Sequence, residues 1–581
     1  MAAATWLGAR WAAPVPLWCG PLVALAGVRT RGRLLALACG LLLVGSALGA
    51  RSIDGLTPVE RSPHDGEVTL VGDPRWFGPS LRVDVRIDGG RRVEAWARGA
   101  AAAALSPRMA GERIELSGRL GPPPDDAPWL VTRHVVGRLS VTEVGEWRRG
   151  DLPSRAANGL RRTLIDGAGT MDPDRRSLYL GLLLGDRSDE DPLVADDFAG
   201  SGLTHLLAVS GSNVAFVMSL LGPLLMRMRL GRRLVAGLAV LAFFALVTRF
   251  EPSVLRATTM AGLGAVAVTF GWESESRRLL AGAVIVLLLV DPLLARSAGF
   301  QLSVAASAGI LVWSRSLASA IRGPRLVVEP LAVTIAAQAA VAPLLIPLFG
   351  GLPVASLPAN LLAGPAAGPV VVWGLPAGLV AGVVGAPADG LLHLPTELFV
   401  SWIGAVAAHG ATWPLGELGL GHLLVAWLGV AAIWFGRQAQ WWRRVGALVV
   451  VAAVLHPAAA MRVGPPTMAD LGPAAQLHRH DDAVVVELDV GVRPATVIEG
   501  LRRAGVRRVD VVVAHHGGRD VAEVVALLAE RAPPRLVLAP SGHRVPGGSV
   551  PVPGQTVRVG GFAIAVEGVD PRLTARVSMP P

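Results

Sequence analysis

The chain contains no lysine, only two cysteines and a single tyrosine among its 581 residues. Arginine therefore carries all of the basic side-chain charge, and the formal net charge of +10 favours contact with phosphates of lipids or nucleic acids. A GC-rich coding bias is the alternative origin of this arginine usage. Cys19 and Cys39 lie in apolar N-terminal stretches without metal-ligand spacing, so neither a disulfide framework nor a cysteine metal site is expected. A Walker A motif is also absent, so energy for any transport is expected to come from elsewhere.

Charged residues are scarce, at 17% against about a quarter in typical soluble domains. Hydrophobic residues make up 52%, and the mean hydropathy is +0.50. This composition predicts a polytopic α-helical membrane protein rather than a large soluble enzyme. The N-terminus lacks a basic segment followed by a cleavage site, so a retained anchor is expected rather than a signal peptide.

Composition changes along the chain and predicts several parts. Residues 51–150 contain about five short runs with period-two alternation, which is typical of half-buried strands and indicates a small OB-like barrel outside the membrane. Gly89-Gly90 predicts a hairpin turn within it. The expected parts are an N-terminal membrane hairpin (1–50), an OB-like β domain (51–150), an amphipathic helix and connector (151–200), a multi-span domain (201–460) and an α/β domain (461–581).

Ten apolar segments between residues 203 and 459 are expected to cross the membrane. Residues 353–363 are short and contain prolines, which predicts a re-entrant or broken helix. Arginine-rich loops are expected on the inner side; they are Arg31 with Arg33, 226–233, Arg277-Arg278, 315–325 and 437–444. This orientation predicts a multi-pass protein of the cytoplasmic membrane whose β domain and C-terminal domain face outward.

The segment 201–216 places polar residues in an apolar run. The cluster is Ser210, Gly211, Ser212 and Asn213. His205 and Ser212 are seven residues apart, so an unbroken helix would put them on one face. Such groups either line a polar pathway or join helices through small residues and interhelical hydrogen bonds.

Further polar residues lie in other apolar segments. Arg256 stands about one turn into its segment, where it either faces a phosphate or snorkels to the interface. Gln301, Ser303 and Asn360 are lone polar groups, each compatible with a packing hydrogen bond. Together these residues predict a polar interior to the helix bundle.

Three other segments have less specific patterns. Residues 152–170 predict an amphipathic helix with Arg161 on its polar side, lying either at the membrane interface or against protein. The acidic loop 185–191 is expected to be a solvated helix start rather than a calcium loop. His478, His480 and Asp481 are expected to be surface residues.

Four motifs in order resemble the ComEC competence family. They are Gly185-Asp-Arg-Ser-Asp through His205-Leu-Leu-Ala-Val-Ser-Gly, Pro252-Ser-Val-Leu-Arg-Ala, Gly299-Phe-Gln-Leu-Ser and Pro358-Ala-Asn-Leu-Leu-Ala. The resemblance, to an actinobacterial-like member, implies a channel that carries single-stranded DNA across the cytoplasmic membrane in natural transformation. It also implies an external DNA receptor and a cytoplasmic DNA-pulling motor or single-strand-binding protein as partners, besides the lipid bilayer. His205, Ser210, Gly211, Ser212, Asn213, Arg256, Gln301, Ser303 and Asn360 are the expected path residues.

The chain departs from that family in two places. Asn213 stands where the family commonly has histidine, so a second ionisable group is missing there. The tail resembles a truncated metallo-β-lactamase-like domain whose metal motif is worn down to His515, His516 and Asp520, in either of two registers. Too few ligands remain for a binuclear centre, so no metal, cofactor or enzymatic activity is expected. The rival interpretations are a membrane-tethered metal-dependent nuclease or other hydrolase, and a small-molecule or lipid transporter.

Overall fold

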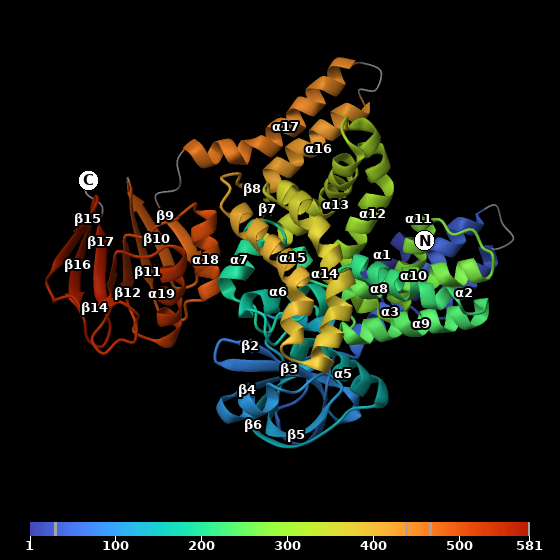
Figure 1. The fold of residues 1–581 in the computed structure, drawn as a ribbon, viewed down its shortest axis with the longest axis horizontal. Helices are drawn as coiled ribbons and strands as arrows, with labels where there is room; N and C mark the ends of the chain where they lie inside the picture. The colour runs from blue at the N-terminus through green and yellow to red at the C-terminus, as the bar shows by residue number, and fades with distance from the viewer. Residues whose placement is uncertain (28–31, 436–439, 464–467, 481, 579–581) are drawn as a thin grey trace. The chain divides into compact units, whose positions relative to one another are not determined.

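The computed structural model describes the chain except for residues 28–31, 436–439, 464–467, 481 and 579–581, which Figure 1 draws in grey. Arg31, residues 437–439 and Asp481, to which the sequence assigned roles, therefore lie outside the described residues. The chain contains two compact units. The first comprises Met1–Asp189, His205–Leu344 and Gly364–Trp402, and the second Glu190–Thr204, Leu345–Ala363 and Ile403–Pro581.

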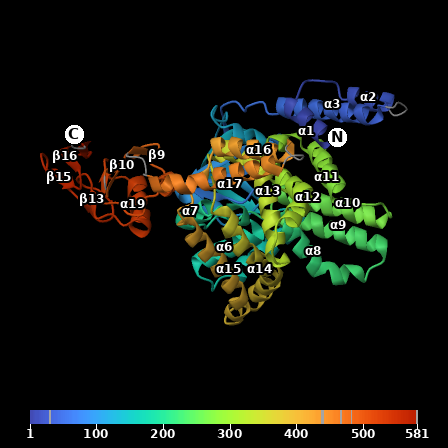
Figure 2. The ribbon, with the colours of Figure 1, turned by 90° about the horizontal axis from the view of Figure 1, so that it is seen from above.

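Three helices form the N-terminal segment: α1 (Ala2–Trp11), α2 (Cys19–Gly27) and α3 (Arg33–Asp54). Both α1 and α2 pack along α3 (Figure 2). Only α3 among them is long and apolar enough to span a membrane. The first arm of the predicted hairpin is thus two short helices rather than one, because Pro14 and Pro16 interrupt the helical hydrogen bonding between them.

The β domain follows the predicted period-two alternation. Its strands are β1 (Ser62–Leu70), β2 (Arg75–Phe77), β3 (Ser80–Arg86), β4 (Arg92–Arg98), β5 (Arg113–Gly121) and β6 (Val135–Arg148). Five of them pair in a closed ring, β1–β3–β4–β6–β5–β1, in which only β4 and β6 run parallel. The short β2 extends the sheet beside β3.

Connections within the β domain explain its register. Gly89 and Gly90 have φ of 76° and 80° in the turn η1 (Asp88–Gly90), which confirms the predicted hairpin between β3 and β4. Helix α4 (Gly99–Leu105) joins β4 to β5, and η2 (Pro128–Arg133) precedes β6. Alternate side chains such as Val83, Val85 and Leu139 fill the core inside the ring.

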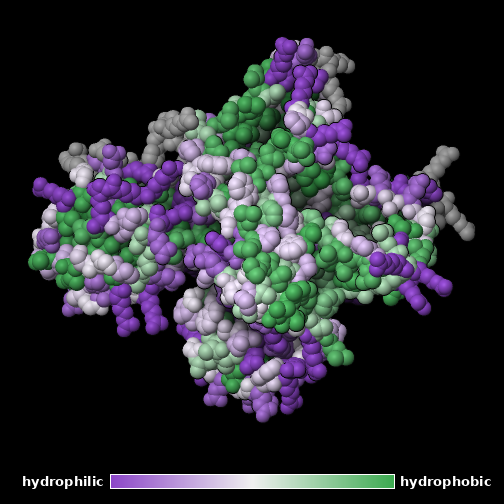
Figure 3. Space-filling model, viewed as in Figure 1, coloured by the Kyte–Doolittle hydropathy of each residue, from purple (hydrophilic) through white to green (hydrophobic). Residues whose placement is uncertain are grey.

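The apolar segments are helical. The helices are α8 (Gly211–Met226), α9 (Leu230–Val247), α10 (Pro252–Thr269), α11 (Ser276–Val290), α12 (Ala298–Ala320), α13 (Arg325–Phe349), α14 (Ser356–Val384), α15 (Ala388–Ala411), α16 (Leu420–Phe435) and α17 (Gln440–Val463). Within the described residues, eight helices qualify as membrane spans by length and hydropathy: α3, α8 with the turn before it, α9, α12, α13, α14, α15 and α17. On the face seen in Figure 3, hydrophobic residues cover much of the long helices.

The predicted break at 353–363 is wrong. Helix α14 begins at Ser356 and continues to Val384. Pro358 stands in its first turn, where a missing N–H removes no intrahelical hydrogen bond. Only Leu352–Pro353 (β7) is extended, and it pairs with β8 (Glu417–Leu418).

The connector contains α5 (Leu152–Gly167), α6 (Pro173–Leu184), α7 (Pro192–Gly200) and η3 (Thr204–Leu206). Helix α5 packs against α9 and buries Ala157, Arg161 and Leu164, whereas Leu152 is exposed. Of the two interpretations of this segment, packing on protein is confirmed. The expected polar side is wrong for Arg161, because that side chain is buried and pairs with Asp73 and Asp186.

The tail contains the predicted alternation of strands and helices. One sheet has the order β14-β13-β12-β11-β10-β9; these strands are β9 (Met468–Gly472), β10 (Ala475–His480), β11 (Ala483–Leu488), β12 (Val511–Ala514), β13 (Leu536–Leu538) and β14 (Gly548–Ser549). Helices α18 (Pro494–Arg503) and α19 (Arg519–Arg531) pack on one face, as Figure 1 shows. A second sheet covers the other face and comprises β15 (Thr556–Val559), β16 (Phe562–Gly568) and β17 (Thr574–Ser578).

Candidate functional site

The polar cluster at the start of α8 is held together by hydrogen bonds. Ser210 is the N-cap residue, and its Oγ contacts Ser212 Oγ and Asn213 Oδ1. Asn213 is 5% exposed and donates from Nδ2 to the Leu182 carbonyl over 2.8 Å. Asn213 therefore joins α8 to α6, while Ser212 is exposed.

Arg256 on α10 lies against this cluster. A Cβ built on Gly211 would come within 2.5 Å of Arg256 Nη2, so the guanidinium occupies the space that a side chain would fill. Arg256 Nε donates to Ser303 Oγ on α12 over 2.8 Å, and Nη1 contacts Met260 Sδ at 3.4 Å. Both acceptors are neutral, so these contacts leave the charge of Arg256 uncompensated. Four of the predicted residues on three helices thus meet: Ser210, Gly211, Arg256 and Ser303.

Three other predicted path residues lie elsewhere. His205 is on η3, and the chain from Leu207 to Ser210 is not helical, so the unbroken helix that would put His205 and Ser212 on one face does not form. The break follows from the extended conformation of Ser210, which caps a new helix. Gln301 Nε2 donates to the Ala295 carbonyl at 2.8 Å, a local bond to η4 (Pro292–Arg296). Asn360 lies in the second unit, near the start of α14.

The outer face of the β domain carries side chains that the sequence reasoning did not select. Alternate residues of β2, β3, β4 and β6 point away from the core and form what we call the arginine–aromatic face: Arg75, Phe77, Arg82, Asp84, Arg86, Arg92, Glu94, Trp96, Arg98 and Arg138. Arg82 stacks 4.1 Å from the Phe77 ring centroid, and Arg138 lies 5.1 Å from that of Trp96. The rings of Phe77 and Trp96 are 5.9 Å apart.

Glu94 is a buried carboxylate that holds side chains of this face in place through hydrogen bonds. It accepts hydrogen bonds from Trp96 Nε1 at 2.6 Å, Arg133 Nη1 at 3.1 Å and Arg138 Nη2 at 3.2 Å. Burial alone would raise the pKa of Glu94, but these donors and charges hold it below its ordinary value. The carboxylate therefore stays ionised and fixes the rings and guanidinium groups in place. The sequence did contain a signal for this face, because arginine or tryptophan recurs at alternate positions in the period-two runs of β3 and β4.

A buried cluster of charges fastens the β domain to the helices of the first unit. Asp73, in the loop before β2, accepts from Arg249 Nε at 3.0 Å and Nη2 at 2.8 Å and pairs with Arg161 at 3.1 Å. Arg161 also binds Asp186 Oδ2 at 2.8 Å and the Val247 carbonyl at 3.0 Å. Asp186 was expected to be solvated, so that prediction is wrong, whereas Asp191 caps α7 as predicted for a helix start.

In the tail, His515 belongs to a pairing with Glu487 and His478. Glu487 lies 2.9 Å from His515 Nε2 and 2.8 Å from His478 Nε2, and His515 Nδ1 contacts the Leu573 carbonyl at 2.8 Å. His478 is 7% exposed, so its expected surface position is wrong. Burial would raise the pKa of Glu487, but the hydrogen bonds and charges of both histidines lower it to about 2.

The predicted vestigial metal residues do not fit a metal centre. Both ring nitrogens of His515 are engaged, His516 Nδ1 accepts from the Gly518 amide, and Asp520 Oδ2 accepts from the Gly491 amide. Across the part of the chain that the structure describes, no three His, Cys, Asp or Glu side chains gather in metal-binding geometry. A binuclear zinc site needs several converging ligands, so these residues cannot supply one.

Comparison with known proteins finds relatives of the segment that contains these helices. Residues 182–445 match the family model described as "Competence protein". ComE operon protein 3 of Bacillus subtilis (strain 168) is 26% identical over 304 residues, which cover 50% of this chain and 39% of that protein. Uncharacterized protein YcaI of Escherichia coli (strain K12) is 28% identical over 211 residues, 32% of this chain and 27% of that protein. The chain thus matches well under two thirds of the length of these curated relatives, and no solved structure matches it.

The matched segment contains the junction of α8, α10 and α12 at which Arg256 meets Ser303 and Gly211. It also contains most of the helices that can span a membrane. Residues 182–445 thus match the family of competence proteins, and eight helices among the described residues are long and apolar enough to span a membrane.

Proposed function

We propose that this protein carries single-stranded DNA across the cytoplasmic membrane during natural transformation. Its family supports a role in DNA uptake. The observation that carries the proposal is Arg256, a cation among apolar helices beside the polar start of α8. Among the described residues, its hydrogen bonds go only to neutral acceptors. Charged groups inside membranes are costly and generally face a pathway or a counter-charge. A passing phosphodiester is the counter-charge that fits.

The β domain is proposed to be an OB barrel that receives the strand. A five-strand ring with one parallel pairing, β4 with β6, and a helix between β4 and β5 fits that barrel. In OB barrels, the face of the second and third strands binds oligonucleotides. Here these strands are β3 and β4, which carry Arg82 and Trp96. Bases would stack on Phe77 and Trp96, and arginines would contact phosphates.

The tail is proposed to be a reduced metallo-β-lactamase-like domain without enzymatic activity. A layer of helices, a mixed sheet and a second sheet fit a part of such a fold. Glu487 pairs with His478 and His515 in an internal ionic contact of this domain.

Sidedness follows from the arginine-rich loops, which are proposed to lie inside the cell. The β domain and the tail would then face outward, where an external receptor delivers DNA. A cytoplasmic motor or single-strand-binding protein would draw in the emerging strand, because the chain has no Walker A motif.

Complementation tests this function. A competent strain lacking its own family protein should regain uptake of labelled DNA when it makes this chain, and should not regain it with Arg256→Gln at equal protein level. The purified chain should also leave labelled DNA uncut with zinc or manganese added. Failure to restore uptake, combined with DNA cleavage, would favour a tethered nuclease. Failure without cleavage would favour a small-molecule or lipid transporter.

A further inference from the structure

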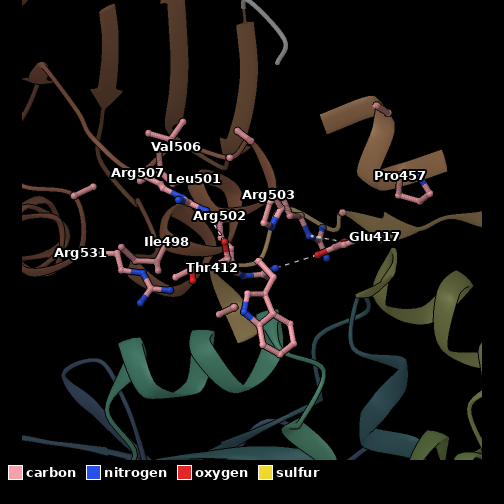
Figure 4. Close-up of a pocket in the computed structure, with 18 of the residues that line it drawn as sticks. Thr412, Glu417, Pro457, Ile498, Leu501, Arg502, Arg503, Val506, Arg507 and Arg531 are labelled. Atoms are coloured by element: carbon pink, nitrogen blue, oxygen red, sulfur yellow. Dashed lines mark hydrogen bonds and ion pairs between the residues drawn. The ribbon is translucent and has the colours of Figure 1, made fainter. Parts of the chain in front are cut away.

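The helices of the tail end in arginines that reach toward other parts of the second unit. Figure 4 shows a cavity there, bordered by Arg502, Arg503 and Arg531 on the tail side and by Glu417 opposite. The cavity measures about 790 Å³. Arg502 and Arg503 end α18, and Arg531 ends α19.

Arg502 makes the most buried of these contacts. Its side chain is 12% exposed, and its Nε donates to Asp196 Oδ1 at 3.0 Å. Its Nη1 donates to Glu417 Oε1, also at 3.0 Å. Asp196 is on α7 and only 6% exposed, so this contact joins the tail to a helix that lies 306 residues earlier in the chain.

A second arginine reaches the same short helix. Arg531 Nη2 lies 2.5 Å from Asp197 Oδ1 and 3.6 Å from Asp196 Oδ2. Two adjacent carboxylates of α7 are therefore held by arginines from two different tail helices. Such paired geometry is directional, because a guanidinium presents its donors in a fixed plane.

Close packing accompanies the ion pairs. A Cβ on Gly200, the last residue of α7, would lie 2.6 Å from Arg502 Cδ and 3.0 Å from Ala411 Cβ. Leu193, in the first turn of α7, packs against the hydrophobic core of the tail. Both ends of α7 therefore contact the tail or its immediate neighbours, and residue 200 must be small.

We infer that the tail serves as a non-catalytic docking domain, in which Arg502 positions α7 and thereby the polar segment that follows it. Ser210 comes only ten residues after Gly200 in the chain. The inference rests on the proposed function in one respect: it makes Arg502 a positioning residue for DNA transport. It explains how a tail without metal ligands can still matter for uptake.

The test uses the full-length protein purified in detergent, and it compares wild type with Arg502→Ala, Arg502→Lys and Arg508→Ala. Arg508 lies shortly after the same helix, its side chain is 57% exposed, and its Nε is as far as 4.0 Å from the Asp510 carboxylate. It is the matched control because its ion pair is long and exposed to solvent. Hydrogen exchange is measured on α7, on residues 201–213 and on β10 to β12 of the tail core. DNA uptake is measured for the same variants in the complemented strain.

Arg502→Ala should speed exchange in α7 and residues 201–213 at least about tenfold while the tail core remains protected. Uptake should fall, Arg502→Lys should restore part of both effects, and Arg508→Ala should change neither. Unchanged exchange in α7 with Arg502→Ala would overturn the docking claim, and faster exchange with normal uptake would overturn the positioning claim. The exchange measurement needs no DNA, so its result stands even if the wild-type protein does not transport DNA.

If Arg502→Ala unfolds the tail core as well, Gly200→Ala serves as the second variant. Its added Cβ collides with Arg502 without removing a charge. It should loosen α7 while leaving β10 to β12 protected, and an unaltered α7 would contradict the inference.

Discussion

Gly211 and Arg256 are in such close contact that a Cβ at residue 211 would come within 2.5 Å of the Arg256 guanidinium. A side chain at residue 211 would have to displace the guanidinium, because of that contact and not because of backbone conformation, since Gly211 begins a regular helix. The guanidinium lies beside the N-terminus of α8, where the helix dipole is positive. Two positive features side by side favour an anion at this junction.

Gly211→Ala should therefore displace Arg256 from Ser303 and reduce DNA uptake by roughly tenfold, equivalent to about 1.4 kcal/mol. Stability should hardly change, because alanine is a better helix former than glycine. The check is uptake of labelled DNA at matched protein level. Gly222→Ala on the same helix is the control, since nothing lies within 4 Å of its added Cβ; equal effects of the two variants would contradict this role for Gly211.

Removing the aromatic rings of the β domain should weaken binding of single-stranded DNA. Trp96→Ala combined with Phe77→Ala removes the two rings on which Arg82 and Arg138 stack. Each lost stacking contact costs about 1–3 kcal/mol, so affinity should drop at least about tenfold. Fluorescence anisotropy with a labelled oligonucleotide measures this.

Trp129→Ala is the matched control for that experiment, because Trp129 is 56% exposed but lies on η2 outside the arginine–aromatic face. Affinity should also fall with rising salt, as phosphate contacts require. Binding that is indifferent to loss of Trp96 and Phe77 would remove the face from the DNA path.

Asp73→Asn should destabilise the first unit by about 3 kcal/mol, because it leaves the buried Arg161 and Arg249 with too little negative charge. Burial raises the pKa of Asp73, but the charges of the two arginines and the hydrogen bonds hold it below its ordinary value. Its stabilising effect is thus present above about pH 4 and is lost as pH falls further. Thermal unfolding of the purified protein should show a pH-dependent loss in the wild type that Asp73→Asn lacks; parallel curves would refute the assignment.

Glu487 and His515 should give the tail a stability maximum in mildly acidic solution. The pKa of Glu487 is lowered to about 2, so its contribution is present above about pH 4.5 and is lost as pH falls toward 2. Burial lowers the pKa of His515, but the hydrogen bonds that it makes to the Glu487 carboxylate and the Leu573 carbonyl, with the charge of Glu487, raise it above its ordinary value. The His515 contribution is therefore full below about pH 6.5 and is lost as pH rises through the folded pKa.

Glu487→Gln should flatten both limbs of that profile. Hydrogen exchange of β11 and β12 in the full-length protein, measured between about pH 2 and pH 8, provides the readout. A profile that Glu487→Gln leaves unchanged would show that the pairing does not govern tail stability.

Local patterns predicted much of the fold. The period-two alternation predicted β3 and β4, and the Gly89-Gly90 pair predicted the turn between them. The apolar segments predicted the long helices, because each of these patterns depends on local backbone geometry alone. Pro358 was misleading because proline breaks a helix interior but suits a first turn, and the sequence does not show where the helix begins.

The sites were less predictable because they depend on contacts between distant segments. The helical pattern placed Arg161 on a polar face, yet this side chain pairs with Asp73 and Asp186, which only the fold brings together. Asn213 and Arg256 were selected because polar groups are rare in apolar segments, but the role of Gly211 depends on α10. The arginine–aromatic face could not be predicted from the sequence, because it depends on the register with which β2, β3, β4 and β6 pair.

Transport of a labelled single strand into lipid vesicles that contain only the purified protein tests the central claim most directly. The strand is added outside, and a single-strand-binding protein enclosed in the vesicles traps what enters. The wild type should accumulate the strand, Arg256→Lys should do so more slowly, and Arg256→Gln should fall to the level of empty vesicles. Equal accumulation by the wild type and Arg256→Gln would contradict a DNA path past Arg256.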